Sequence, residues 1–333
     1  MIQRVELEIS SDCNAACPGC ARTQNIQLVR PKNLTLEQIH SWFPDPQGIK
    51  FKFCGVLGDP IVNPQCLEIT KYLVDGGGEI QYSTNGARNS AAWWRELALL
   101  GVDVHWCIDG TSTNYIYRVN TNYNIIKRNM QAYSDSGGGG TWIYIVFDHN
   151  EHEVDEARSL AGELGFKFAT RTGMRNSLHT WQAQIGKKNN REVKRITTTG
   201  AKAHSKIAVV RELDAFIQDT NKSQEQTRQI VNTIDCKYHH GNEIYIGADS
   251  TLWPCCFLYD SAFKNKESIN DKYSIYPSDW NDLNTYTIQE ILSTPYYQQT
   301  LRDSWDPQHS LHMPRCIRTC ARAGAYQNEI IYS

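Results

Sequence analysis

The stretch Arg4–Cys20, RVELEISSDCNAACPGC, joins a strand pattern to three closely spaced cysteines. Residues Arg4–Ile9 alternate polar and apolar side chains, as a half-buried strand does. Cys13, Cys17 and Cys20 follow at x3 and x2 spacing. Three thiolates on one short loop do not complete a tetrahedral zinc site, whereas a 4Fe-4S cluster tolerates one iron without a protein ligand. The stretch therefore predicts an open metal centre directly after the first strand.

The composition of the chain is that of an ordinary globular protein. Its 333 residues suffice for one large domain or two ordinary ones. Lys and Arg total 34 against 36 Asp and Glu, so the overall charge gives no reason to expect nucleic acid or an anionic membrane as a partner. Without an apolar run of membrane-spanning length or a secretory signal pattern, we expect a cytoplasmic protein. Eleven cysteines are many for a reducing compartment, where clustered cysteines more often hold metal.

Segments with β propensity alternate with helix-like segments in the first half of the chain. The expected strands are Arg4–Ile9, Ile49–Phe53, Glu79–Ser83, Asp103–Ile108, Thr141–Phe147 and Phe166–Thr170. The expected helices are Thr35–Phe43, with an N-cap at Asn33 or Thr35, Pro64–Val74, Ala91–Leu100, Tyr123–Tyr133 and Glu151–Leu164. This alternation predicts an α/β fold with a parallel sheet, either open and doubly wound or a partial barrel.

Polar and metal-binding residue types follow the carboxyl ends of these strands. They are Cys13, Cys17, Cys20, Gly58, Asp59, Thr84, Asn85, Asp109, His149, Asn150, Arg171 and Thr172. Because the loops after parallel strands converge at one edge of the sheet, that edge is where ligands bind in parallel α/β folds. We therefore expect the functional site at this edge.

The cysteine loop after the first strand of a (βα)6 pattern resembles the signature of radical S-adenosylmethionine (radical SAM) enzymes. The resemblance implies a partial (βα)6 TIM-like barrel and a 4Fe-4S cluster held by Cys13, Cys17 and Cys20. It implies that the amino and carboxylate groups of S-adenosylmethionine chelate the fourth iron. It further implies reductive cleavage of S-adenosylmethionine to a 5′-deoxyadenosyl radical, which abstracts a substrate hydrogen, and an electron donor such as flavodoxin or ferredoxin.

Other motifs support the resemblance and imply the residues that bind S-adenosylmethionine. The segment 55–60, GVLGDP, loosely matches the Gly-Gly-Glu motif that receives the methionine amino group, with Asp59 where Glu is usual. Gly19 stands where many members carry an aromatic residue over the adenine, so we expect Phe147 to take that role. The segment 83–86 resembles a stretch near the ribose, and 107–110 a Ser-Ile-Asp-Gly stretch. The expected binding residues are Gly58, Asp59, Pro60, Ser83, Thr84, Asn85, Asp109, Arg118 and Phe147.

The sequence does not identify the group that handles protons. By their place at strand ends, Asp109, Asp148, His149 and Arg171 are candidates, although ordinary polar loop residues would look the same. Three isolated cysteines, Cys54, Cys66 and Cys107, are interpreted as buried packing residues.

A second cysteine set lies in the last hundred residues. Cys236, Cys255, Cys316 and Cys320 are enough to close a complete site, with Cys256 as an alternative to its neighbour Cys255. Their order resembles the C-terminal SPASM extension of radical SAM enzymes in its shortened twitch form, which implies one auxiliary 4Fe-4S cluster. Seven residues rather than the family's four separate Gly247 from Cys255. A structural zinc site made by the same cysteines is the alternative.

Three regions and three functional hypotheses follow. We expect a radical SAM core at 1–175, a polar linker or insertion at 176–231 whose segment 187–211 is basic, and a twitch/SPASM-like domain at 232–333. We expect no separate leader-peptide-binding domain before Arg4. The leading hypothesis is an oxidoreductase that oxidises or crosslinks a peptide. One alternative is a dehydrogenase or epimerase of a carbohydrate, aminocyclitol or nucleotide-derived small molecule. The other is a zinc-bearing nucleic-acid-binding or scaffold protein.

Overall fold

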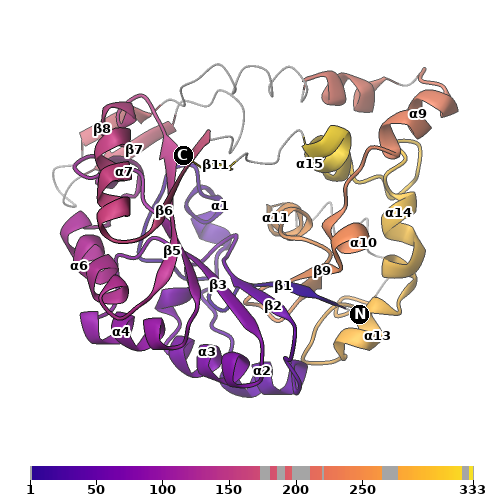
Figure 1. Cartoon of the computed structure of the whole chain (residues 1–333). Helices are drawn as coiled ribbons and strands as arrows, with labels where there is room; N and C mark the ends of the chain where they lie inside the picture. Colours follow the sequence, from indigo (N-terminus) through magenta and orange to yellow (C-terminus); the bar gives the residue numbers. More distant parts are fainter. Residues whose placement is uncertain are drawn as a thin grey trace.

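A single nine-stranded sheet organises the fold (Figure 1). The computed structural model describes residues 2–172, 181–185, 192–196, 211–219, 221–264, 277–324 and 330–332. The strand order is β10-β9-β1-β2-β3-β4-β5-β6-β11, in which β9 through β6 pair in parallel and the two outermost strands pair antiparallel. The strands are β1 (Arg4–Leu7), β2 (Lys50–Phe53), β3 (Glu79–Thr84), β4 (Asp103–Cys107), β5 (Gly139–Val146), β6 (Lys167–Thr172), β9 (Glu243–Ile246), β10 (Leu252–Trp253) and β11 (Ile330–Tyr332).

The order of the first six strands distinguishes the two architectures that the sequence left open. In a doubly wound sheet the order reverses at a switch point, whereas here β1 to β6 follow one another without reversal. Figure 1 shows the helices between them together on the outer side of the sheet. They are α2 (Leu36–Trp42), α3 (Cys66–Asp75), α4 (Ala91–Leu99), α6 (Tyr123–Ser134) and α7 (Val154–Glu163). Since the sheet also has two free ends in its order, the fold is a partial barrel.

The expected strands and helices are confirmed to within a few residues at their ends. Helix α2 begins after Thr35, whose side chain accepts from Gln38 N in a capping box, so Thr35 rather than Asn33 is the N-cap. Strand β5 begins at Gly139, earlier than the expected Thr141. Gly140 makes this possible, because a Cβ there would lie 2.2 Å from the carbonyl oxygen of Val104 on β4.

The two faces of the sheet differ in chemistry. Val5 and Leu7 of β1 and Phe51 and Phe53 of β2 belong to the main hydrophobic core, together with apolar residues of the outer helices. Side chains alternate along a strand, so the intervening residues face the inside of the partial barrel. On β1 and just beyond it these are Glu6 and Glu8, both buried. The inner face therefore carries charged groups beneath the edge where ligands are expected.

The C-terminal part of the chain joins the same sheet, because β9 pairs in parallel with β1. Its other elements gather beside these strands in Figure 1. They are α9 (Gln224–Val231), α10 (Lys237–Gly241), α11 (Cys256–Lys264), α13 (Ile288–Leu292), the π-helical η4 (Tyr296–Thr300), α14 (Leu301–Asp303) and α15 (Pro314–Gly324), after helical residues 211–218.

Smaller elements complete the described structure. Among the described helices, none has both the length and the apolar character that crossing a membrane requires. Most of the basic segment 187–211 lies outside the described residues. The short elements are α1 (Ala21–Gln24), η1 (Ile26–Leu28), η2 (Pro60–Val62), α5 (Asn114–Tyr117), η3 (Glu151–Glu153) and a separate antiparallel pair, β7 (Trp181–Ile185) with β8 (Glu192–Ile196).

Candidate functional site

The three N-terminal cysteines lie on the loop between β1 and α1, partly exposed. The Cys13 sulfur accepts from Ala15 N at 3.4 Å and from Asn85 Nδ2 at 3.7 Å. Burial, and then the nearby Asp59, raise the pKa of Cys13, and the other two cysteines contribute to this rise. The set is thus compact, and N–H groups are directed at one of its sulfurs. Such donors stabilise the sulfur of a cluster-bound thiolate, so these residues suit an iron–sulfur cluster.

The loop after β2 packs against the start of the cysteine loop. A Cβ at Gly58 would lie 1.8 Å from the carbonyl oxygen of Ser10, so only glycine allows the two backbones to approach this closely. Asp59 N donates to the carbonyl oxygen of Asp12 at 2.8 Å. Of the residues expected at this position from the sequence, Gly58 and Asp59 therefore pack against residues 10–12, directly before Cys13, and Pro60 follows them as the first residue of η2.

The carboxylate of Asp59 is buried and fully engaged within the protein. Oδ1 accepts from Thr84 Oγ1 at 2.7 Å and from Ile61 N at 3.3 Å. Oδ2 accepts from Asn85 N at 2.8 Å and from Asn85 Nδ2 at 2.6 Å. Burial raises the pKa of Asp59. The aspartate thus joins the ends of β2 and β3 and orients Asn85. Ser83, another residue expected from the sequence, lies half-buried on β3.

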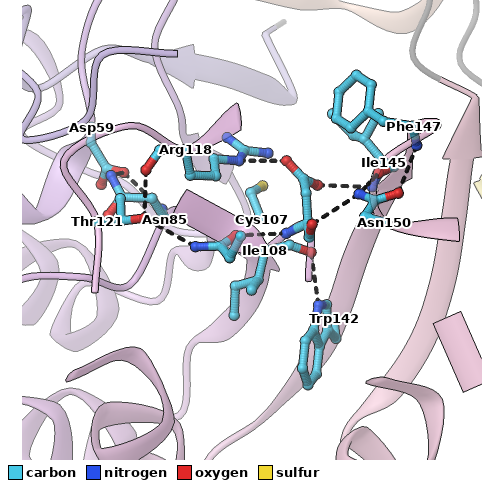
Figure 2. A network of polar contacts seen from close by, with 12 residues as sticks. Asp59, Asn85, Cys107, Ile108, Arg118, Thr121, Trp142, Ile145, Phe147 and Asn150 are labelled. Atoms are coloured by element: carbon cyan, nitrogen blue, oxygen red, sulfur yellow. Dashed lines mark hydrogen bonds and ion pairs between the residues drawn. The ribbon is translucent and has the colours of Figure 1, made fainter. Parts of the chain in front are cut away.

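Asp109 is buried at the end of β4, where it takes part in a polar network. Figure 2 shows this network with its labelled members Arg118, Ile145 and Asn150. Its Oδ2 accepts from Arg118 Nε at 2.7 Å, and its Oδ1 accepts from Ile145 N at 2.8 Å. Asn150 Nδ2 donates to its carbonyl oxygen, and its own N–H donates to Asn114 Oδ1, both at 2.8 Å. Asp109 therefore fixes Arg118 and the end of β5 relative to β4, and reaches no solvent.

The remaining candidates from the sequence occupy different environments. Phe147 is buried and packs at 4.5 Å, ring centre to ring centre, on Tyr117 and at 5.4 Å on His149. Asp148 is exposed and lies 3.5 Å from Nδ1 of His149, whose pKa is lowered by burial. Arg171 is half-buried on β6, and its Nε has no hydrogen-bond partner among the described residues. The structure thus places the aromatic stack at the edge of the site rather than in an open position.

Sequence reasoning missed two buried glutamates. Glu153 Oε2 accepts from Thr111 N at 2.7 Å and Ser112 N at 3.2 Å, and so holds the loop after Asp109. Gly110 makes this loop possible with φ of 144° and no space for a Cβ. Glu8 holds the loop after β2 in the same way, through Leu57 N at 2.6 Å. A carboxylate at an inward position of a strand between apolar residues was a signal that could have identified Glu8.

The C-terminal cysteines come from separate segments and meet at one apolar pocket. Cys236 precedes α10, Cys255 lies between β10 and α11, and Cys316 and Cys320 are one turn apart on α15. All four line the pocket, together with Ile234, Leu301 and Trp305. Burial, and then Cys255, Cys236 and Cys320, raise the pKa of Cys316, in agreement with their proximity.

The other cysteines do not line the pocket of the C-terminal set. Cys256 does not line the pocket of Cys255, and instead lies near Glu6 and Lys237. Cys66 is buried against the Tyr82 hydroxyl at 3.2 Å, as a packing residue would be, whereas Cys54 and Cys107 are half-buried on the inner face. Among the residues that the structure describes, no three His, Cys, Asp or Glu side chains form a group that could hold one metal ion.

Comparison with known proteins agrees with this geometry. Residues 7–161, just under half of the chain, match the model of the Radical SAM superfamily. Mycofactocin maturase MftC of Mycobacterium tuberculosis is 25% identical over 163 residues, which cover 47% of this chain and 41% of the relative. The match thus spans less than half the length of this relative.

Solved structures share the fold. A structure of anSMEcpe with bound AdoMet has a TM-score of 0.54 at 14% identity, covering 96% of this chain and 90% of that one. Streptococcus suis SuiB bound to S-adenosylmethionine has a TM-score of 0.51 at 9% identity, covering 81% of this chain and 65% of that one. Residues 7–161 thus match the Radical SAM superfamily, and the solved structures share the partial-barrel fold of the chain.

Proposed function

We propose that this protein binds a 4Fe-4S cluster through Cys13, Cys17 and Cys20 and cleaves S-adenosylmethionine reductively. The observation that carries the proposal is the compact cysteine loop at the carboxyl edge of the partial barrel, with Asn85 directed at the Cys13 sulfur. The cluster and S-adenosylmethionine, when bound, supply a 5′-deoxyadenosyl radical that abstracts hydrogen from a substrate.

The chain's own contribution is to bind, orient and exclude water. The backbone beside Gly58 approaches the cysteine loop, Asp59 holds Asn85, and Asp109 holds Arg118. Asp59, Asn85 and Asp109 are buried, and hydrogen bonds orient Asn85 and Arg118, which limits where the cosubstrate can lie. A primary carbon radical attacks most nearby C–H bonds, so this restraint is what gives the reaction a single target.

The C-terminal set, Cys236, Cys255, Cys316 and Cys320, is proposed to hold a second 4Fe-4S cluster in a twitch-like arrangement. Support comes from their convergence on one apolar pocket with four thiol ligands. The four thiols would hold this cluster away from substrate, where it would supply an acceptor for one electron from a substrate radical.

A peptide is the proposed substrate, and the proposed reaction is its oxidation or crosslinking. Support comes from the named relative, a mycofactocin maturase, and from a solved structure of anSMEcpe with bound AdoMet and a Cp18Cys peptide, which has a TM-score of 0.54. A cytoplasmic location and a flavodoxin or ferredoxin as electron donor are part of the same proposal.

The proposal is tested with anaerobically reconstituted, reduced protein incubated with S-adenosylmethionine and candidate peptides. We expect brown protein with about eight irons per chain, formation of 5′-deoxyadenosine, and a peptide that has lost the mass of H2. An unchanged mass with inverted stereochemistry would instead identify an epimerase. Colourless protein that contains zinc and no iron would overturn the proposal in favour of a zinc-bearing scaffold.

A further inference from the structure

The loop between β2 and η2 has its amide groups held from below. Val56 N donates to the Tyr245 hydroxyl at 3.4 Å, and Leu57 N and Gly58 N both donate to Glu8 Oε1, at 2.6 and 3.1 Å. Asp59 N, the next in sequence, donates to the backbone of Asp12. All successive N–H groups of residues 56–59 are therefore occupied by the body of the protein.

The residues around Glu8 bury its side chain and leave room for its carboxylate. Glu8 is 1% exposed. A Cβ at Gly55 would lie 2.4 Å from Glu8 Oε1, so the absence of a side chain at Gly55 leaves room for the carboxylate. Tyr245 of β9 is fully buried, so the loop is held by one group from the barrel and one from the C-terminal part of the chain.

The loop presents carbonyl oxygens rather than N–H groups. With its N–H groups engaged, the loop retains carbonyl oxygens, and that of Val56 lies 4.0 Å from the Cys20 sulfur. Carbonyl oxygens bind ammonium groups well. The carboxylate of Asp59, by contrast, already accepts four hydrogen bonds from within the protein.

We propose that Glu8 and Tyr245 are positioning residues that hold the loop at residues 56–58 so that its carbonyl groups receive the amino group of S-adenosylmethionine. The inference rests on the proposed function. It also links the C-terminal strand β9 to the binding of S-adenosylmethionine, since Tyr245 contacts the loop directly.

The contact of Glu8 with the loop should make the binding of S-adenosylmethionine depend on pH. Burial raises the pKa of Glu8 to about 7, and the groups that face it are Tyr245 on β9, Tyr259 on α11, Asp249 after β9 and Cys54 after β2. The ionised carboxylate is the stronger acceptor for the two amides. Binding of S-adenosylmethionine should therefore tighten as the pH rises through about 7.

The experiment measures the dissociation constant of S-adenosylmethionine by anaerobic equilibrium dialysis between pH 6 and pH 9, for wild type, Glu8→Gln and Tyr245→Phe. Glu6→Gln is the matched control, because Glu6 is also buried and lies two residues away on the same face, but bonds to Lys52 at 2.8 Å instead of the loop. We expect about tenfold weaker binding for Glu8→Gln at pH 8, with unchanged iron content, and a smaller loss for Tyr245→Phe. The amino group of S-adenosylmethionine titrates alike with every protein, so the difference between the profiles isolates Glu8.

A second measurement needs neither cluster nor cosubstrate. Amide hydrogen exchange at residues 56–58 should accelerate in Glu8→Gln and Tyr245→Phe but not in Glu6→Gln. Equal affinities and equal pH profiles for wild type and Glu8→Gln would overturn the inference. Wild-type protein that binds iron but not S-adenosylmethionine would instead overturn the proposed function.

Discussion

The two cysteine sets of this chain are built in opposite ways. The N-terminal set comes from one loop of eight residues, and its surroundings are polar, with Asn85 directed at a sulfur and Asp59 nearby. The C-terminal set comes from three separate segments, and it lines a pocket whose other walls include Ile234, Leu301 and Trp305. The first has three thiols and polar neighbours, whereas the second has four thiols and a mainly apolar lining to which Lys237 and Arg315 also contribute.

This difference indicates a division of roles. A site with one ligand missing and polar groups around it can accept another molecule, while a site with a full set of thiols inside an apolar pocket is closed to substrates. The proposed chemistry on a cosubstrate therefore fits the N-terminal set, and the proposed electron transfer fits the C-terminal one.

The strongest test of these roles is to replace Cys13, Cys17 and Cys20 together with Ala. We expect complete loss of 5′-deoxyadenosine formation and loss of about half of the iron, because the C-terminal set remains intact. Iron analysis and single-turnover assays measure both. Continued turnover by the triple variant would show that the assignment of roles is wrong.

The adjacent pair Cys255 and Cys256 tests which cysteines make up the C-terminal set. Cys255→Ala should lower the iron content from about eight to about four and leave cleavage of S-adenosylmethionine in place. Cys256→Ala should keep the full iron content, since only Cys255 lines the pocket. The same loss of iron in both variants, or in neither, would contradict this assignment.

The contrast between the sets also explains what could be predicted from the sequence. The spacing of Cys13, Cys17 and Cys20 is local, so it is visible without a structure, as is the periodic alternation that predicted the first six strands. The parallel pairing of β9 with β1 joins residues more than two hundred positions apart, and no local pattern carries it. Likewise, Glu8 and Glu153 act on amides of distant loops, and their function depends on tertiary contacts.

Gly58→Ala tests whether the N-terminal site depends on close backbone approach. A Cβ would meet the Ser10 carbonyl oxygen at 1.8 Å, and neither backbone segment can move freely. We expect the free energy of unfolding to fall by about 1–3 kcal/mol, together with weaker S-adenosylmethionine binding, as measured by chemical denaturation and dialysis. Gly162→Ala on α7, where no atom lies within 4 Å, is the control and should be neutral or slightly stabilising. Equal stability and equal S-adenosylmethionine binding of the two variants would show that the N-terminal site does not depend on this close backbone approach.

Two buried carboxyl groups on the inner face, Glu6 and Glu8, should affect the stability of the fold oppositely as the pH changes. Burial tends to raise the pKa of Glu6, but Lys52 and then Lys237 outweigh it and lower that pKa from 4.5 to about 2. Burial raises the pKa of Glu8 from 4.5 to about 7. Glu6 therefore stabilises the fold above pH 4.5, and this stabilisation is lost as the pH falls toward 2. Glu8 destabilises the fold as the pH rises from 4.5 to 7, because the folded protein retains a proton that the unfolded chain releases.

Chemical denaturation between pH 3 and pH 8 of wild type, Glu6→Gln and Glu8→Gln separates these effects. Each pKa shift of about 2.5 units corresponds to at most about 3.4 kcal/mol. Relative to wild type, Glu8→Gln should gain stability progressively between pH 5 and pH 7, whereas Glu6→Gln should lose least at the acidic end. Parallel curves for all three proteins would mean that neither carboxyl group has a shifted pKa in the folded state. A gain by Glu8→Gln together with weaker S-adenosylmethionine binding would show that Glu8 lowers stability while it positions the loop beside the open site.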